Sequence, residues 1–181
     1  AGGAVYSPAI TDFIFMVEQT SFMFVTGPNV VKTVTHENVT AEELGGAAAH
    51  STKSGVTHFA CANEVECLKQ IKKILGYIPQ NCEDDAPRHP YVPTQEGRPA
   101  LNDIIPANPN QPYDMRDVIH EIVDTDSFFE VHKNFAENIV VGFARIAGRS
   151  IAYHGLRESG RPSRIQGSRR ATTASPAGGG Y

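Results

Sequence analysis

Two continuous apolar runs lie near the start of the chain. Residues 13–17 read Phe-Ile-Phe-Met-Val and residues 22–25 read Phe-Met-Phe-Val, with the polar stretch 18–21 between them. A strand with one face in water alternates apolar and polar residues, whereas a strand covered on both faces is apolar throughout. The pattern therefore predicts two buried strands at these positions.

Two helices are predicted after these strands. Pro28 suits the first position of a helix, because its missing N–H would have no acceptor there. The sequence Thr-Ala-Glu-Glu at 40–43 is a capping box and predicts a short helix at about 41–50. Gly45 and Gly46 lie inside that helix, so we expect either a break or a close approach of two backbones there.

A second capping sequence, Asn-Glu-Val-Glu at 63–66, begins the strongest helical signal of the chain. Lysines crowd its last turns, where cations complement the helix dipole, and Gly76 and Pro79 end it. The spacing predicts a helix at about 64–75. Its predicted buried face carries four apolar residues at helical spacing: Val65, Leu68, Ile71 and Leu75.

A proline-rich stretch follows this helix. Residues 79–112 contain eight of the twelve prolines of the chain and few large apolar residues. Such a composition is typical of a linker or an extended surface crossing. We expect a linker at 81–112 that separates two packed groups, residues 1–80 and residues 113–151.

Regular structure is predicted again after the linker. Asp114 is placed to cap a helix over 115–123, and the apolar runs 128–131 and 139–146 predict strands. A turn at 147–149 leads into a further strand at 150–151. Residues 152–181 are rich in Arg, Gly, Ser, Ala and Pro, a composition that predicts disorder. The order of helices and strands indicates an α/β fold.

Charge and cysteine content narrow the class of protein. The net charge is −4, but residues 1–150 hold 11 Lys and Arg against 19 Asp and Glu, while 151–181 hold 5 Arg against one Glu. The three cysteines form no CxxC pair, which favours free thiols in a reducing compartment. No run approaches the roughly 20 apolar residues of a membrane span. The basic tail favours disorder over a nucleic-acid site, because no aromatic residue lies among its arginines.

Several motifs resemble catalytic or metal sites without completing one. The sequence His-Glu-Ile-Val-Asp at 120–124 has Asp124 where a zinc-protease helix needs its second His. His50, His58 and Cys61 lack metal-ligand spacing. The Thr-Lys-Ser at 52–54 lacks the glycine that precedes the lysine of a phosphate-binding loop. We therefore predict no metal site.

The glycine pair Gly2-Gly3 is the strongest candidate for chemistry, although most such pairs are only turns. Adjacent glycines allow consecutive N–H groups to face one ligand oxygen. Ahead of a short helix, they could form an oxyanion hole strengthened by the helix N-terminus.

The chain resembles the carboxyltransferase β subunits that act on propionyl-CoA and related acyl-CoAs. The likeness covers most of residues 1–151 apart from the proline-rich stretch. It is carried by the segments 1–12, 24–28, 30–32, 42–47, His50, 54–56, 113–114, 118–119, Asp124, 127–130 and 136–145.

This resemblance implies a crotonase-like (ClpP/crotonase) superhelix of ββα units in two lobes. Residues 1–80 would be the end of the N-terminal lobe, and 113–151 the start of the C-terminal lobe, so the chain would be an internal fragment. The family moves a carboxyl group from carboxybiotin to the α-carbon of an acyl-CoA through an enolate. Biotin would be carried by a biotin carboxylase and carrier α subunit, and the β subunits would form a hexamer.

On the same resemblance, the backbone N–H groups of Gly2 and Gly3 form the oxyanion hole and Ala4 contacts the substrate. A subunit of a methylmalonyl-CoA decarboxylase or transcarboxylase of the same fold is the alternative, and a basic-tailed nucleic-acid-binding protein is a third class. The resemblance implies a cytoplasmic protein, or a mitochondrial matrix protein if the source is eukaryotic. Residues 152–181 do not resemble the family, and we expect an out-of-register reading of the gene there. The fragment alone is expected to be inactive.

Overall fold

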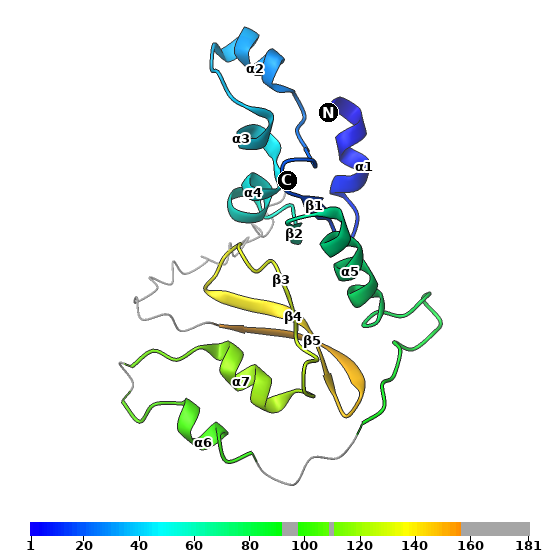
Figure 1. The fold of residues 1–181 in the computed structure, drawn as a ribbon, viewed down its shortest axis with the longest axis vertical. Coiled ribbons are helices and arrows are strands. Elements are labelled where there is room, and N and C mark those ends of the chain that lie inside the picture. The colour runs from blue at the N-terminus through cyan, green and yellow to red at the C-terminus, as the bar shows by residue number, and fades with distance from the viewer. Residues whose placement is uncertain (92–97, 109–110, 157–181) are drawn as a thin grey trace, which may run out of the picture.

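The computed structural model describes residues 1–91, 98–108 and 111–156. Figure 1 shows two groups of elements that lie against each other. The first group consists of η1 (Gly2–Val5), α1 (Tyr6–Ala9), β1 (Phe15–Val17), α2 (Pro28–Thr35), α3 (Ala41–Gly45), α4 (Ala47–Ala49), η2 (His50–Ser54), β2 (Phe59–Cys61) and α5 (Glu64–Leu75). The second consists of α6 (Leu101–Ile104), α7 (Met115–Ile122), β3 (Phe129–Val131), β4 (Ile139–Ile146) and β5 (Arg149–Leu156).

β1 and β2 form a parallel pair that begins with Phe15 opposite Phe59. The apolar run at 13–17 therefore does contain a buried strand, as predicted. The predicted strand at 22–25 is wrong, because only Phe22 makes an isolated bridge, to Gly46. The Met23 N–H donates to the Gly45 carbonyl at 2.8 Å, which holds this segment against α3 and leaves Phe22 exposed.

The helices around Gly46 follow the local sequence signals. Pro28 occupies the first turn of α2. The Thr40 hydroxyl accepts a hydrogen bond from the Glu43 N–H, and the Glu43 carboxylate accepts one from the Thr40 N–H, so the predicted capping box is present. The helix breaks at Gly46, and a side chain at Gly45 would meet the Met23 carbonyl. The break and the close approach of two backbones expected at Gly45 and Gly46 are both confirmed.

α5 spans the predicted residues, but it buries a different face from the predicted one. The Asn63 side chain accepts a hydrogen bond from the Glu66 N–H at 2.9 Å and caps the helix. Val65 and Leu68 remain 63% and 60% exposed, whereas Ile74 is buried beside Cys67. The prediction of the buried face was wrong because β1 and β2 cover only a narrow stripe of this helix.

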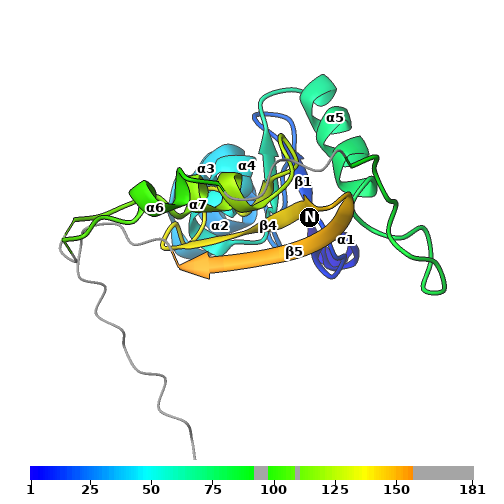
Figure 2. The same cartoon turned by 90° about the horizontal axis from the view of Figure 1, so that it is seen from below.

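The second group is a three-stranded antiparallel sheet, in the order β3-β4-β5, with α7 packed on it. Asp114 caps α7 as predicted by accepting a hydrogen bond from the Arg116 N–H. β5 pairs with β4 from Arg149 to Leu156 and forms the edge of the sheet (Figure 2). The predicted tail boundary after residue 151 is therefore wrong, because residues 152–156 continue the strand. The rest of that tail, 157–181, lies outside the described residues.

The described residues of the proline-rich stretch include a short helix that the sequence did not predict, α6. α5 packs on β1 and β2, and α7 packs on β4. The two groups are nevertheless not separate. One core cluster joins Phe59 and Tyr77 of the first group to Phe129 and Val131 of the second. The expected separation by the linker is corrected accordingly: aromatic residues from both groups share one core.

Candidate functional site

The glycine pair Gly2-Gly3 lies at the start of a helix, where the sequence led us to look for amide donors. Gly2 has φ +66°, a left-handed conformation that glycine adopts without a steric cost. Its N–H donates to the Val25 carbonyl at 2.8 Å. That amide is therefore already used, and it fixes the start of the helix to the segment before α2.

The next amide, that of Gly3, differs from that of Gly2. Gly3 lies in the first turn of η1, whose N–H groups have no acceptor within the helix, and η1 continues directly into α1. Gly3 and Ala4 are both exposed. The arrangement offers one exposed amide at the positive end of a short helix, which suits an oxyanion.

The segment around Gly45, Gly46 and His50 supports this region structurally. The Nε2 of His50 contacts the Met23 carbonyl at 2.6 Å, and its Nδ1 contacts the Ser54 hydroxyl at 2.7 Å. These contacts tie η2 to the segment at 22–25, which in turn holds Gly2. No chemistry was predicted for His50, and both of its ring nitrogens have structural partners.

The incomplete motifs have structural roles as well. In the part of the chain that the structure describes, no group of three or more His, Cys, Asp and Glu could hold a metal ion. The Asp124 carboxylate accepts hydrogen bonds from the N–H groups of Ala147 and Gly148, at 3.0 and 2.7 Å, and so fixes the β4–β5 turn. Burial and the neighbouring Cys67 thiol raise the pKa of Cys61 to about 12, which leaves this thiol unreactive.

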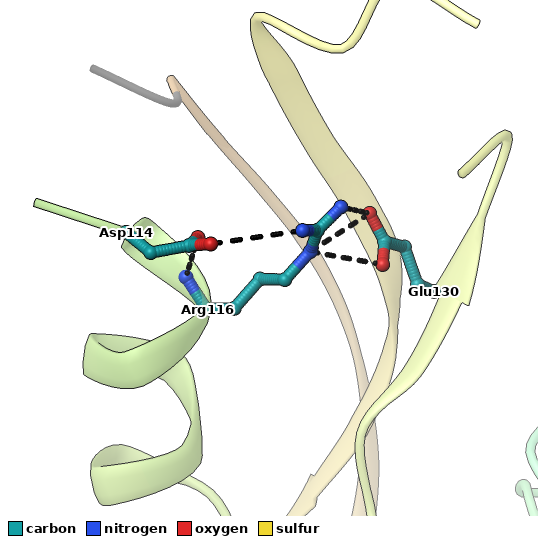
Figure 3. A network of polar contacts seen from close by, with 3 residues as sticks. All are labelled: Asp114, Arg116 and Glu130. Atoms are coloured by element: carbon teal, nitrogen blue, oxygen red, sulfur yellow. Dashed lines mark hydrogen bonds and ion pairs between the residues drawn. The ribbon is translucent and has the colours of Figure 1, made fainter. Parts of the chain in front are cut away.

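An ion-pair network ties α7 to the sheet (Figure 3). The Arg116 guanidinium donates to both carboxylate oxygens of Glu130, with the shortest contact at 2.8 Å, and lies 3.6 Å from Asp114. The hydrogen bonds that it donates to Glu130 raise the pKa of Arg116. No local sequence pattern predicts this ion pair, because Arg116 and Glu130 lie in different elements.

A second set of contacts joins the two groups of elements. Arg145 lies over the Tyr77 ring, 4.0 Å from its centroid, and donates to the Gly76 carbonyl at 2.9 Å. The Tyr77 hydroxyl donates to the Ser127 carbonyl. Burial raises the pKa of Tyr77. These residues lie away from the glycine pair and position the two groups rather than a substrate.

Among the described helices, none is long and apolar enough to cross a membrane.

Comparison with known protein families gives one matching family model. The model of the carboxyl transferase domain matches residues 1–156, which includes both Gly3 and β5. The match thus extends past residue 151, where the resemblance in the sequence was expected to end.

Curated relatives match over the same region. The chain is 49% identical over 152 residues to the propionyl-CoA carboxylase beta chain of Roseobacter denitrificans, a match that covers 83% of this chain and 30% of the relative. It is 54% identical over 153 residues to the methylmalonyl-CoA decarboxylase subunit alpha of Veillonella parvula, with the same coverage. The chain therefore spans about a third of the length of these relatives.

A solved structure shows the same arrangement of elements. The transcarboxylase 12S, solved as a hexamer with hydrolysed methylmalonyl-coenzyme A bound, superposes with a TM-score of 0.83 at 43% identity. The superposition covers 86% of this chain and 31% of that one.

Proposed function

The chain belongs to the carboxyl transferase domain family and has its crotonase-like fold, and from that premise we propose that it is part of an acyl-CoA carboxyltransferase subunit. The reaction is transfer of a carboxyl group to the α-carbon of an acyl-CoA, with propionyl-CoA as the preferred substrate. The observation that carries the proposal is the match of residues 1–156 to the family model, with the exposed Gly3 amide inside it.

The chemical role of this chain is to stabilise negative charge on a thioester oxygen. Carboxylation at the α-carbon passes through an enolate, whose oxygen needs donors that are fixed before the charge develops. The Gly3 N–H is such a donor, and the helix η1–α1 behind it adds a favourable partial charge. Gly2 contributes by its backbone shape, since its own N–H is bound to Val25. Ala4 lies next to this amide, where it would contact the acyl-CoA.

The carboxyl donor would be carboxybiotin on a biotin carboxylase and carrier α subunit, which supplies an activated carboxyl group when bound. No residue of this chain is proposed to hold biotin permanently. We further propose that the β subunits assemble as a hexamer, in keeping with the hexameric transcarboxylase 12S. The three free cysteines favour a reducing compartment, the cytoplasm or, for a eukaryotic source, the mitochondrial matrix.

A methylmalonyl-CoA decarboxylase or transcarboxylase subunit is the second candidate. The identity of 54% to the Veillonella subunit is higher than the 49% to the Roseobacter propionyl-CoA carboxylase chain, and methylmalonyl-CoA is propionyl-CoA carboxylated at the α-carbon. The site geometry is compatible with either, because loss and gain of the carboxyl group share one enolate.

A chimera tests the proposal. Residues 1–156 would replace the aligned segment of the Roseobacter propionyl-CoA carboxylase beta chain, and transfer of labelled carboxyl to propionyl-CoA would be measured with its α subunit. Gly3→Pro removes the amide donor, while Gly3→Ala keeps it and meets no neighbouring atom. Loss of one such donor should lower kcat about 10²–10³-fold. A chimera that folds and assembles without activity contradicts the proposed function, and equal activity of the two variants contradicts the role of Gly3.

A further inference from the structure

A cavity of about 510 Å³ opens between β2, α5 and the end of β3. Its wall combines residues of both groups of elements, including His58 and Gln70 from the first and His132 and Lys133 from the second. It lies away from the glycine pair at the start of η1. Its size is within the range of small-molecule sites, and the proposed carboxyl transfer gives it no role.

Two buried atoms in this wall lack hydrogen-bond partners among the described residues. They are the Gln70 side-chain oxygen Oε1 and the His132 ring nitrogen Nδ1. A buried polar atom without a partner is costly, and each such atom calls for an explanation, such as a ligand or water. The Gln70 oxygen can only accept, so a ligand that satisfies it must bring an O–H or N–H donor.

The wall also supplies hydrogen-bond donors. The Ile14 N–H donates to His58 Nδ1 at 3.1 Å, so the proton of a neutral His58 is on Nε2. Lys73 lies at the cavity with its ammonium 4.9 Å from the centroid of the Phe129 ring, and among described residues it has no ion pair. Lys133 lines the same cavity.

The carboxylates of the wall do not cancel these cations. Glu130 is held by Arg116, and the Glu66 carboxylate accepts a hydrogen bond from the Ala62 N–H at 3.1 Å. Among the described residues Lys73 and Lys133 have no ion pair, whereas both carboxylates of the wall have partners within the protein. The two lysines therefore favour an anion in this cavity.

The geometry points to a binding site for a small hydroxylated anion in this cavity. Its anionic group would lie near Lys73, Lys133 and the His58 Nε2–H. Its hydroxyl would donate to the unpaired Gln70 oxygen. Phosphate and carboxylate both fit as the anionic group, since both accept hydrogen bonds from ammonium and imidazole donors.

Calorimetric titration of the full chain tests this site with four probes: glycerol 3-phosphate, glycerate, n-propyl phosphate and propionate. The last two lack hydroxyls. The pairs are glycerol 3-phosphate with n-propyl phosphate, and glycerate with propionate. In at least one pair we expect the hydroxylated probe to bind about tenfold more tightly, because it makes one more hydrogen bond, to a buried acceptor. The pair that binds more tightly identifies the anion as phosphate or carboxylate. No binding by either hydroxylated probe, or equal binding within both pairs, would overturn the proposal.

Three variants complete the test. Lys73→Met should weaken the hydroxylated probe about tenfold, because it removes a charge-assisted hydrogen bond. Lys69→Met, on the exposed side of α5, is the matched control and should leave affinity unchanged. Gln70→Met should remove the preference for hydroxyls while leaving the hydroxyl-free probe unaffected. Equal weakening by Lys69→Met and Lys73→Met, or a preference that survives Gln70→Met in a folded protein, would refute the site.

Discussion

His58 and His132 show how single residues hold the two groups of elements together. Their rings lie 4.3 Å apart between centroids, and the His132 N–H donates to the His58 carbonyl at 3.1 Å. Burial lowers the pKa of both imidazoles, and the nearby His132 lowers that of His58 further, whereas a hydrogen bond with the Thr57 backbone partly offsets the effect of burial on the pKa of His132. Because His58 Nδ1 already accepts from Ile14, a proton there would break that hydrogen bond. The junction therefore requires neutral rings.

The free energy of unfolding should fall as the pH is lowered from 7.5 through the ordinary histidine pKa of 6.5. The folded-state pKa lies below the unfolded one, so the unfolded chain binds more protons in this window and acid favours it. Urea unfolding at pH 7.5, 6.5 and 5.5 would measure the slope.

His132→Phe keeps a ring for stacking and removes one titrating group, so its stability should depend less steeply on pH than that of the parent chain. His36→Asn, at the exposed C-terminal end of α2, serves as the control and should keep the parent slope. An unchanged slope in His132→Phe would show that acid destabilises the protein elsewhere.

At the scale of elements, local signals were reliable and long-range ones were not. The caps at Thr40, Asn63 and Asp114 were predicted correctly, because each depends on a side chain and an amide within three residues. The apolar run at 22–25 was wrongly predicted as a strand. Its backbone partner is Gly45, whose carbonyl accepts a hydrogen bond from the Met23 N–H, and no local pattern in the sequence shows this pairing. Likewise, β5 continues to Leu156 because its residues pair with β4 up to Ile139. The amino-acid composition of residues 152–156 does not show this pairing.

The candidate site was predicted only in part, for the same reason. The sequence placed the pair Gly2-Gly3 ahead of a short helix, and η1 does begin at Gly2, while the role of these amides as an oxyanion hole stays a prediction. The hydrogen bond from Gly2 to Val25 joins residues far apart in the sequence, so the sequence could not show that this amide is engaged. The cavity wall combines residues from β2, α5 and β3, and no local motif marks it.

The Arg116–Glu130 pair should stabilise the packing of α7 on β3 by about 1 kcal/mol, measured as the coupling energy of a double-mutant cycle. The two side chains are only 25% and 14% exposed, and the contact is bidentate. Arg88 and Asp85, exposed by 61% and 93% at 3.9 Å, give the comparison cycle, where coupling should be near zero. Similar coupling energies in the two double-mutant cycles would contradict the prediction that the bidentate contact and the burial of Arg116 and Glu130 make this pair the stronger one.

Truncation tests the extent of β5. A chain ending at residue 151 loses the pairs of residues 152–156 with β4 and the packing of Tyr153 on the cluster around Ile119. A chain ending at 156 keeps them. We expect the shorter chain to be less stable by about 2 kcal/mol or more, from lost hydrogen bonds and aromatic packing. Equal urea midpoints for the two chains would show that the strand end contributes nothing.

At the scale of the whole molecule, the two groups of elements form one body. Phe15, Phe59 and Phe129 stack in sequence across the junction, with centroid distances of 4.5 and 4.9 Å, and Arg145 covers Tyr77 beside them. Large apolar side chains nevertheless remain exposed on α2 and α5, such as Val34 and Leu68. The chain also spans about a third of its relatives. The presence of a shared core in this chain therefore does not imply that the chain contains a complete active site.

This chain alone should not transfer a carboxyl group to an acyl-CoA at a useful rate. In the proposed site the Gly3 amide is one oxyanion donor, and each missing donor costs about 3 kcal/mol in the transition state. Loss of a positioned carboxyl donor forfeits a proximity effect of up to about 7–11 kcal/mol. Labelled carboxyl transfer from carboxybiotin to propionyl-CoA would be compared between the purified chain, its heat-denatured control and the chimera. Turnover by the chain above the denatured control would show that Gly3 and its neighbours form a more complete site than the geometry indicates.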